Sequence, residues 1–187
     1  MSTARSIETT TPTTPQRWAR VEAQGVREFL AFLLGPEAYA LPLSCVREIM
    51  RVPVITEVPR APHEVLGIVS VRGQVTTLLD LRRKLKVAET SISTRTRVLL
   101  VDQGDEILGL LCDRVLQVHR LSEEEVEMAS VLGREASSYV MGIGRPGQRK
   151  AANQQQNQSG KTEAAAGEDQ ILILLDPIVL LKRHAYG

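Results

Sequence analysis

Several residue types and patterns that usually mark an enzyme or a metal site are scarce in this sequence. The 187 residues include two cysteines, three histidines and, as aromatic side chains, one Trp, three Tyr and two Phe. No CxxC pair is present, no two histidines stand four residues apart, and no serine lies in a G-x-S-x-G elbow or after a Walker A loop. Zinc sites, nucleophilic hydrolases and P-loops depend on such spacings. We therefore expect no metal, no cofactor and no enzymatic activity.

The two cysteines, Cys45 and Cys112, each stand within an apolar stretch. Apolar surroundings favour buried, reduced thiols, because a free cysteine packs as a small hydrophobe. A disulfide or a metal site is the alternative that the sequence leaves open.

The sequence also lacks an excess of one charge and a long apolar run. Its 23 basic and 22 acidic residues give a net charge of +1, which argues against broad electrostatic binding to nucleic acid. The longest apolar stretch, residues 171–181, is interrupted by Asp176 and Pro177, and the N-terminus has no apolar segment of the signal-peptide kind. We expect a soluble, cytoplasmic protein that does not insert into a membrane.

An internal repeat is the most informative pattern that is present. Residues 65–74 resemble residues 139–148, and each segment is followed by an apolar run that ends in an aspartate, Asp80 or Asp176. Upstream, residues 29–43 and 98–111 are each two apolar runs joined by a glycine-containing turn. Short paired runs of this kind are typical of β-hairpins. The repeat therefore predicts two similar sub-barrels with a seam between them, which is a natural place for binding.

Turn and capping residues refine this interpretation. Arg72 and Gly73 predict a tight turn between strands at residues 67–71 and 75–79, because glycine readily adopts the positive φ of such a turn. Asp80 and Asp176 are expected to cap short helices through their carboxylates, which explains both without a catalytic role. Residues 43–50 are interpreted as a short helix or turn.

Two segments carry no sign of a packed core. Residues 1–26 are rich in Thr and Pro early on and are interpreted as a disordered leader. The two repeats are 75 positions apart at Gly67 and Gly142 but 96 apart at Asp80 and Asp176. The extra residues fall near 148–168, which contain no Val, Ile, Leu, Met or aromatic residue, and predict a disordered insertion within a hairpin.

The segment G-I-V-S-V-R-G-Q at 67–74, with Leu79-Asp80-Leu81 after it, resembles the CheW family of bacterial chemotaxis coupling proteins. Four further blocks follow in family order, at residues 29–41, 46–49, 109–118 and 171–181. The resemblance covers about residues 27–185, outside the insertion, as a single domain of two interleaved sub-barrels. It implies a mainly β fold of two five-stranded SH3-like barrels side by side, with short capping helices.

The resemblance also implies a function and partners. CheW-like proteins are non-enzymatic adaptors that link the cytoplasmic tips of methyl-accepting chemoreceptors to the regulatory domain of a CheA-type histidine kinase. They are recruited to membrane receptor arrays, where they also meet other CheW-like domains in rings. The receptor tip, a helical hairpin, docks in the groove between the barrels.

Carried over by position, the resemblance implies a set of groove residues and, less directly, a kinase-facing pair. The implied receptor-binding groove consists of Leu30, Leu43, Val46, Glu48, Ile49, Arg72 and Val115, and the implied kinase-facing residues are Arg97 and Val98. Arg97 is a departure, since many members carry an apolar residue there. Arg72 as a solvated turn residue, Glu48 as a solvated charge and the apolar members as plain core remain the alternatives.

Two further functions stay open beside the main one. The leader, the insertion and Arg97 are also compatible with a specialised adaptor of another chemosensory pathway, such as surface motility or gene regulation. Such an adaptor would bind the receptor with weak or no kinase binding. A third hypothesis is a small-molecule pocket at the seam, although the sequence provides no acid–base constellation for it.

Overall fold

A computed structural model describes residues 25–88, 91–104, 106–129, 138–147 and 170–182. The predicted insertion, residues 148–168, lies outside the described residues, as does the predicted leader up to residue 24. Gly25 and Val26 are described, and Val26 already begins the first strand.

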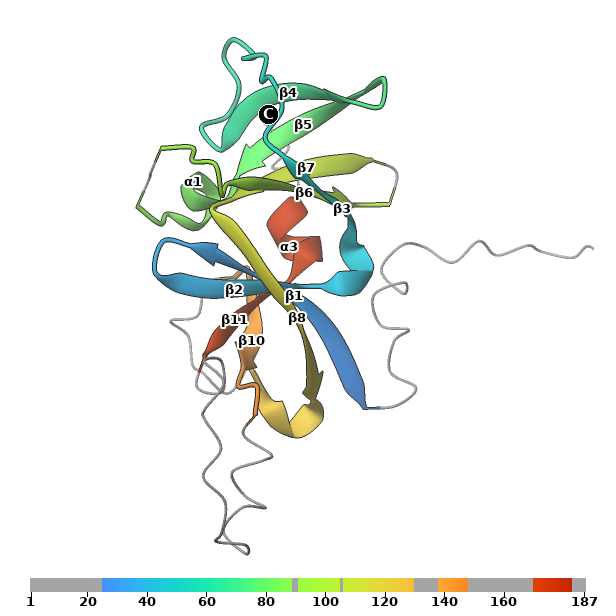
Figure 1. The fold of residues 1–187 in the computed structure, drawn as a ribbon, viewed down its shortest axis with the longest axis vertical. Helices are drawn as coiled ribbons and strands as arrows, with labels where there is room; N and C mark the ends of the chain where they lie inside the picture. Colours follow the sequence, from blue (N-terminus) through green and yellow to red (C-terminus); the bar gives the residue numbers. More distant parts are fainter. Residues whose placement is uncertain (1–24, 89–90, 105, 130–137, 148–169, 183–187) are drawn as a thin grey trace, which may run out of the picture.

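The described chain forms two sheets and a few short helices, stacked one above the other in Figure 1. The upper sheet has five strands in the order β3-β6-β7-β5-β4, and the lower has six in the order β8-β1-β2-β11-β10-β9. The strands are β1 (Val26–Leu34), β2 (Glu37–Pro42), β3 (Val46–Arg51), β4 (Val65–Val71), β5 (Gln74–Asp80), β6 (Arg97–Asp102), β7 (Ile107–Cys112), β8 (Arg114–Ser122), β9 (Val126–Met128), β10 (Val140–Gly144) and β11 (Leu172–Leu175). The helices are α1 (Leu81–Leu85) and α3 (Pro177–Leu181), with one-turn 3-10 helices η3 (Leu43–Cys45) and η4 (Glu123–Glu125).

The two halves of the chain exchange strands. β3 follows the β1–β2 hairpin but pairs with β6 in the upper sheet, and β8 follows the β6–β7 hairpin but pairs with β1 in the lower sheet. Each sheet also contains one parallel pair, β5 with β7 and β2 with β11. The expected fold of two SH3-like sub-barrels is therefore confirmed, with six strands in one sheet where five were expected.

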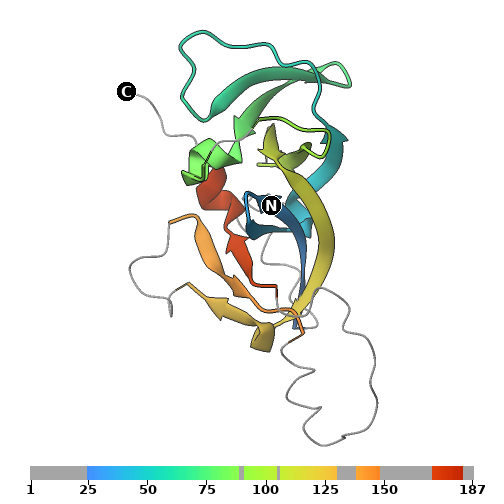
Figure 2. The same ribbon diagram turned by 60° about the vertical axis from the view of Figure 1, so that its left-hand side comes forward.

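The central hairpins are buried on both faces, which explains why they read as continuous apolar runs. In β1, Leu30, Phe32 and Leu34 pack into a central cluster shared by both sheets. Phe29 and Ala31 pack into a cluster within the lower sub-barrel. In β6, Leu99 faces the central cluster and Val98 faces a third cluster within the upper sub-barrel. α3, between the two sheets in Figures 1 and 2, contributes its leucines to the central cluster.

The difference in strand number has a cause in the sequence. In the lower sheet, β9 pairs with β10 next to Gly142. In the upper sheet, the corresponding neighbour of β4 is reduced to a single bridge between Thr56 and Ile68, with hydrogen bonds of 2.9 and 2.8 Å in the two directions. Pro53 and Pro59 flank Thr56, and proline cannot donate to a ladder, so no longer strand forms there.

Short helices and caps largely follow the prediction. The Asp80 carboxylate accepts from the backbone N–H of Arg82 at 2.9 Å, and that of Asp176 accepts from Ile178 at 2.8 Å, ahead of Pro177. Residues 43–50 differ from the expected helix or turn. Only Leu43–Cys45 form a 3-10 helix, and the following residues become β3, because β6 offers them a ladder partner from the other half of the chain.

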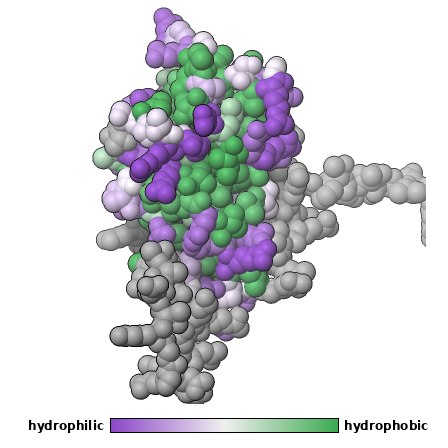
Figure 3. Space-filling model, viewed as in Figure 1, coloured by the Kyte–Doolittle hydropathy of each residue, from purple (hydrophilic) through white to green (hydrophobic). Residues whose placement is uncertain are grey.

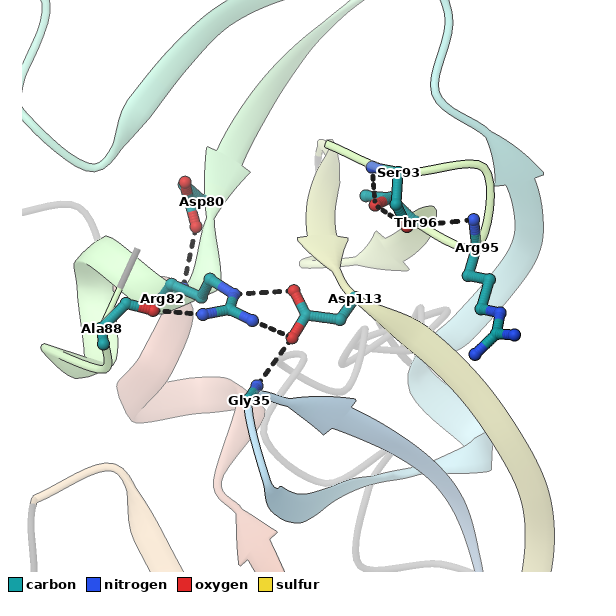
Figure 4. Close-up of polar contacts among 8 residues, drawn as sticks. All are labelled: Gly35, Asp80, Arg82, Ala88, Ser93, Arg95, Thr96 and Asp113. Atoms are coloured by element: carbon teal, nitrogen blue, oxygen red, sulfur yellow. Dashed lines mark hydrogen bonds and ion pairs between the residues drawn. The ribbon is translucent and has the colours of Figure 1, made fainter. Parts of the chain in front are cut away.

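A buried ion pair ties these elements together (Figure 4). The Arg82 side chain, at the start of α1, is 6% exposed and makes a two-bond contact with the Asp113 carboxylate, which lies between β7 and β8. The Arg82 guanidinium also donates to the carbonyl of Ala88, and Asp113 accepts from the backbone N–H of Gly35 in the β1–β2 turn at 2.6 Å. Each nitrogen of the Arg82 guanidinium and each oxygen of the Asp113 carboxylate thus has a hydrogen-bond partner, which offsets the cost of burying the pair.

We expect Asp113→Ala to lower the free energy of unfolding by about 2–4 kcal/mol, because it leaves the buried Arg82 charge without its partner. Arg82→Ala should cost less, because Asp113 is 28% exposed and water can reach its carboxylate. The double variant should lose clearly less than the sum of the two. Urea denaturation of the four proteins measures this coupling, and additive effects would show that the pair does not act as a unit.

Gly67 provides a second test, because a Cβ there would lie 2.3 Å from the carbonyl oxygen of Thr56, and its φ is +150°. We expect Gly67→Ala to cost about 2–4 kcal/mol, through strain and displacement of the bridging segment. Gly73→Ala is the matched control, since Gly73 has a φ of +83° but no atom within 4 Å of the added carbon. Equal losses of thermal stability in the two variants would contradict the steric explanation.

Candidate functional site

A groove lies where the edge strand of each sheet meets the other. β3 is an edge of the upper sheet and β8 an edge of the lower, and Ile49 of β3 and Val115 of β8 line one pocket of about 320 Å³. Ile49 is 43% exposed, so much of this apolar side chain is open to solvent. In Figure 3 a hydrophobic area runs down the middle of one face, with hydrophilic groups on either side. The structure thus brings together two of the predicted groove residues from distant parts of the sequence.

Arg72 lies at the tip of the β4–β5 hairpin. Arg72 and Gly73 both have positive φ, 51° and 83°, which is the geometry of the tight turn that the sequence predicted. The Arg72 guanidinium contacts the Glu48 carboxylate of β3 at 2.9 Å, and the Arg72 side chain is 79% exposed. An exposed pair of this kind contributes at most about 1 kcal/mol. The main effect of the ion pair is to hold the exposed Arg72 guanidinium beside β3.

Leu43 and Val46 are half-buried and pack against the central cluster, as Val115 of the groove also does. Two other predicted binding residues have buried side chains. Leu30 is 3% exposed within the central cluster, and Val98 is fully buried within the upper sub-barrel. Both lie on hairpins covered on two faces, so neither offers its side chain to a receptor or a kinase in this structure.

Arg97, the other residue assigned to a kinase-facing surface, lines the same pocket as Ile49 and Val115. Strand register explains this position, because Arg97 is paired with Arg51 of β3 on one side and with Cys112 of β7 on the other. Arg95 and Arg114 complete the pocket lining. Sequence reasoning missed Arg51, Arg95 and Arg114. Arg51 reaches Arg97 through the β3–β6 ladder, and Arg114 follows Cys112, the partner of Arg97 in β7.

Both cysteines are buried free thiols. Burial raises the pKa of the Cys45 and Cys112 thiols to about 12, and in Cys112 the neighbouring Asp113 carboxylate adds to the shift. Such thiols are protonated and unreactive at neutral pH. In the part of the chain that is described, no three His, Cys, Asp or Glu side chains gather as ligands for a metal ion.

The seam between the sub-barrels contains a second, smaller pocket of about 260 Å³, lined largely by aliphatic side chains of β4, β5, β7 and α3. Its lining includes four charged residues, Glu64, Lys84, Glu106 and Lys182. Lys84 and Glu64 lie 3.6 Å apart, and Lys84 also lies over the ring of Tyr139. The pocket is slightly below the usual size of ligand sites. Nothing in its lining favours the small-molecule hypothesis over a packing gap.

Residues 142–147 match the spacing G-x-G-x-x-G, a string that often marks a dinucleotide site. In the structure Gly142 and Gly144 lie within β10 and are paired with β9 and β11. A Cβ on Gly142 would lie 2.5 Å from the Glu127 carbonyl oxygen, and a Cβ on Gly144 would lie 2.6 Å from the Leu121 side chain. Close strand packing, and not a phosphate, accounts for these glycines.

A search of the helices in the described ranges finds none that is both long and apolar enough to span a membrane.

Comparison with known proteins gives consistent matches. The model of the CheW-like domain family matches residues 28–185. The chemotaxis protein CheW of Helicobacter pylori is 31% identical over 124 residues, covering 66% of this chain and 75% of the relative. Protein FrzA of Myxococcus xanthus is 30% identical over 129 residues, covering 69% and 81%.

The crystal structure of the scaffolding protein TtCheW from Thermoanaerobacter tengcongensis superimposes with a TM-score of 0.65 at 21% identity, covering 86% of this chain and 95% of that one. This likeness establishes the shared fold. Together with the family match over most of the described body, it leads to one conclusion: this chain belongs to the CheW-like domain family.

Proposed function

We propose that this chain is a non-enzymatic coupling protein of a chemosensory pathway. It links the cytoplasmic tips of methyl-accepting chemoreceptors to the regulatory domain of a CheA-type histidine kinase. The observation that carries the proposal is the groove in which Ile49 and Val115 meet, on a CheW-like fold. Glu48, the ion-pair partner of Arg72, precedes Ile49 in β3. Relatives that are themselves named chemotaxis protein CheW support the same role.

The groove has the properties that helix-in-groove recognition requires. An exposed Ile49 over a half-buried Val115 provides an apolar contact for one side chain of a docked helix, and Val115, like Leu43 and Val46, packs against the central cluster. Arg72, presented on a tight turn, sets orientation through its fixed guanidinium fork. Such a site binds and positions a partner without any chemical step, as an adaptor requires.

Recruitment follows from this role. The chain works in the cytoplasm and reaches the membrane through the receptors that it binds, and it joins other CheW-like domains in array rings. The contact with the kinase uses surface outside the groove, because Val98 is buried and Arg97 lines the groove itself.

A second candidate is a specialised adaptor of another chemosensory pathway, with receptor binding but weak or no kinase binding. The observation that favours it is the set of arginines in the groove, together with a relative, FrzA, that bears a name other than CheW. The affinity of the full chain for the regulatory domain of a CheA-type kinase separates the two candidates. Micromolar or tighter binding favours the coupling protein, and no binding at that concentration favours the specialised adaptor.

Ile49→Asp should weaken binding of a receptor signalling-tip fragment at least tenfold, since about 1.4 kcal/mol is lost when one apolar anchor is replaced by a charge. It should also abolish stimulation of kinase autophosphorylation in a mixture of receptor fragment, kinase and this chain. Ile178→Asp is the matched control, because Ile178 of α3 is 39% exposed and lies outside the groove. Equal behaviour of the two variants would move the receptor site elsewhere.

Arg72 is tested by a charge swap. Arg72→Glu should weaken receptor binding about tenfold through loss of a partner contact. The double variant Arg72→Glu/Glu48→Arg restores an internal ion pair of reversed direction. If it also restores binding, the role of Arg72 is only to hold the hairpin tip, and a direct contact with the receptor is excluded.

A further inference from the structure

Four arginines gather on one side of the groove. Arg95, Arg97 and Arg114 line the pocket with Ile49 and Val115. Arg51 stands directly opposite Arg97 in the β3–β6 ladder. Like charges in directly opposed positions of a sheet are destabilising, so this arrangement needs a reason.

No carboxylate within the described ranges neutralises the four. Other arginines of the chain are paired: Arg47 lies 2.8 Å from Asp102, Arg120 lies 2.8 Å from Glu28, and Arg82 contacts Asp113. None of the four groove arginines makes an ion pair with a described residue. In a protein of net charge +1, this is a local positive field beside an exposed apolar contact.

The Arg97 side chain is also held in place. The Nη1 group of Arg97 donates to the carbonyls of Thr94 and Thr96 at 2.9 and 2.8 Å. Its Nε and Nη2 groups, which form the fork that carboxylates bind, have no acceptor among the described residues.

The loop before β6 is fixed as well. The backbone N–H of Ser93 donates to Thr96 Oγ1 at 2.8 Å, and the backbone N–H of Arg95 donates to Ser93 Oγ at 3.1 Å. Figure 4 shows the Arg95 side chain extending away from this loop toward β3. A cation held as Arg97 is loses little side-chain entropy when it binds an anion.

Two long segments outside the described residues carry no excess of negative charge. Residues 1–24 contain three arginines against two glutamates, and residues 148–169 contain three basic and three acidic residues. A neutral or basic segment does not compensate four arginines. These two segments therefore do not supply the complementary charge, which a partner molecule can carry.

We propose that the groove selects a receptor segment that is acidic. The occupant is a helix that inserts an apolar side chain between Ile49 and Val115 and carries Asp or Glu about one turn away, where the carboxylates pair with Arg95, Arg97 and Arg114. Side chains three or four positions apart share one face of a helix, which matches an apolar contact flanked by charges. The identity of the helix as a receptor tip rests on the proposed function, whereas its acidic character rests on the arginines.

The first experiment uses the full chain and receptor signalling-tip fragments from its own organism. Arg95→Gln/Arg114→Gln should weaken binding at least tenfold at about 150 mM salt and flatten its salt dependence, because charge pairing is screened by ions. Arg120→Gln/Arg145→Gln removes the same charge from the other sub-barrel, where these arginines face Glu28 and Glu127, and should change binding less than about twofold. A change below about twofold in the groove variant, with Ile49→Asp still disruptive, would overturn the inference and leave receptor coupling intact.

If no receptor fragment binds, that result counts against the proposed function. A second experiment then still tests the acidic character of the occupant. It uses a pair of helical peptides, each with a central Leu flanked at i−4 and i+4 by Glu in one peptide and by Gln in the other. Wild type should bind the Glu peptide at least fivefold more tightly, and the groove variant should show no preference. Equal affinity of wild type for the two peptides would overturn the inference. Salt-sensitive self-association that the groove variant loses would make a second copy the occupant and overturn the receptor assignment.

Discussion

The central hairpins, β1–β2 and β6–β7, have to be buried on both faces, and most of the architecture depends on this constraint. One face of each hairpin packs into the cluster shared by the two sheets, and the other packs into the core of its own sub-barrel. A small chain can cover four such faces only if each half contributes strands to the sheet of the other. The exchange of β3 and β8 between the halves satisfies that requirement and prevents the two sub-barrels from being independent units.

The Arg82–Asp113 pair lies where these exchanges meet. It joins α1, the β7–β8 junction and the β1–β2 turn, three segments that are distant in sequence. Because apolar packing is not directional, it does not by itself fix how one sub-barrel is oriented on the other. A buried, geometrically specific pair with every hydrogen-bonding group engaged adds that direction.

The groove is a consequence of the same exchange. Both of its walls are edge strands, β3 and β8, which were transferred to the opposite sheet and have a neighbour on one side only. Apolar residues left at these edges remain partly exposed, as Ile49 does, and the chain places arginines around them. The arrangement that completes the core therefore also creates the surface on which an adaptor would receive its partner.

Much of the fold was predictable from local sequence, whereas the composition of the site was only partly so. Hairpins, the Arg72–Gly73 turn and the Asp80 and Asp176 caps depend on neighbouring residues, and these predictions are confirmed. Residues 46–51 become a strand because of a ladder partner about fifty positions away, and Leu30 and Val98 are core because their hairpins are covered on both faces. By itself the sequence determined the repeat, the turns, the caps and the two-barrel plan, since these follow from short-range backbone chemistry and periodicity. Only the tertiary structure decided which arginines surround Ile49, because cross-strand register between segments far apart in the chain brings them together.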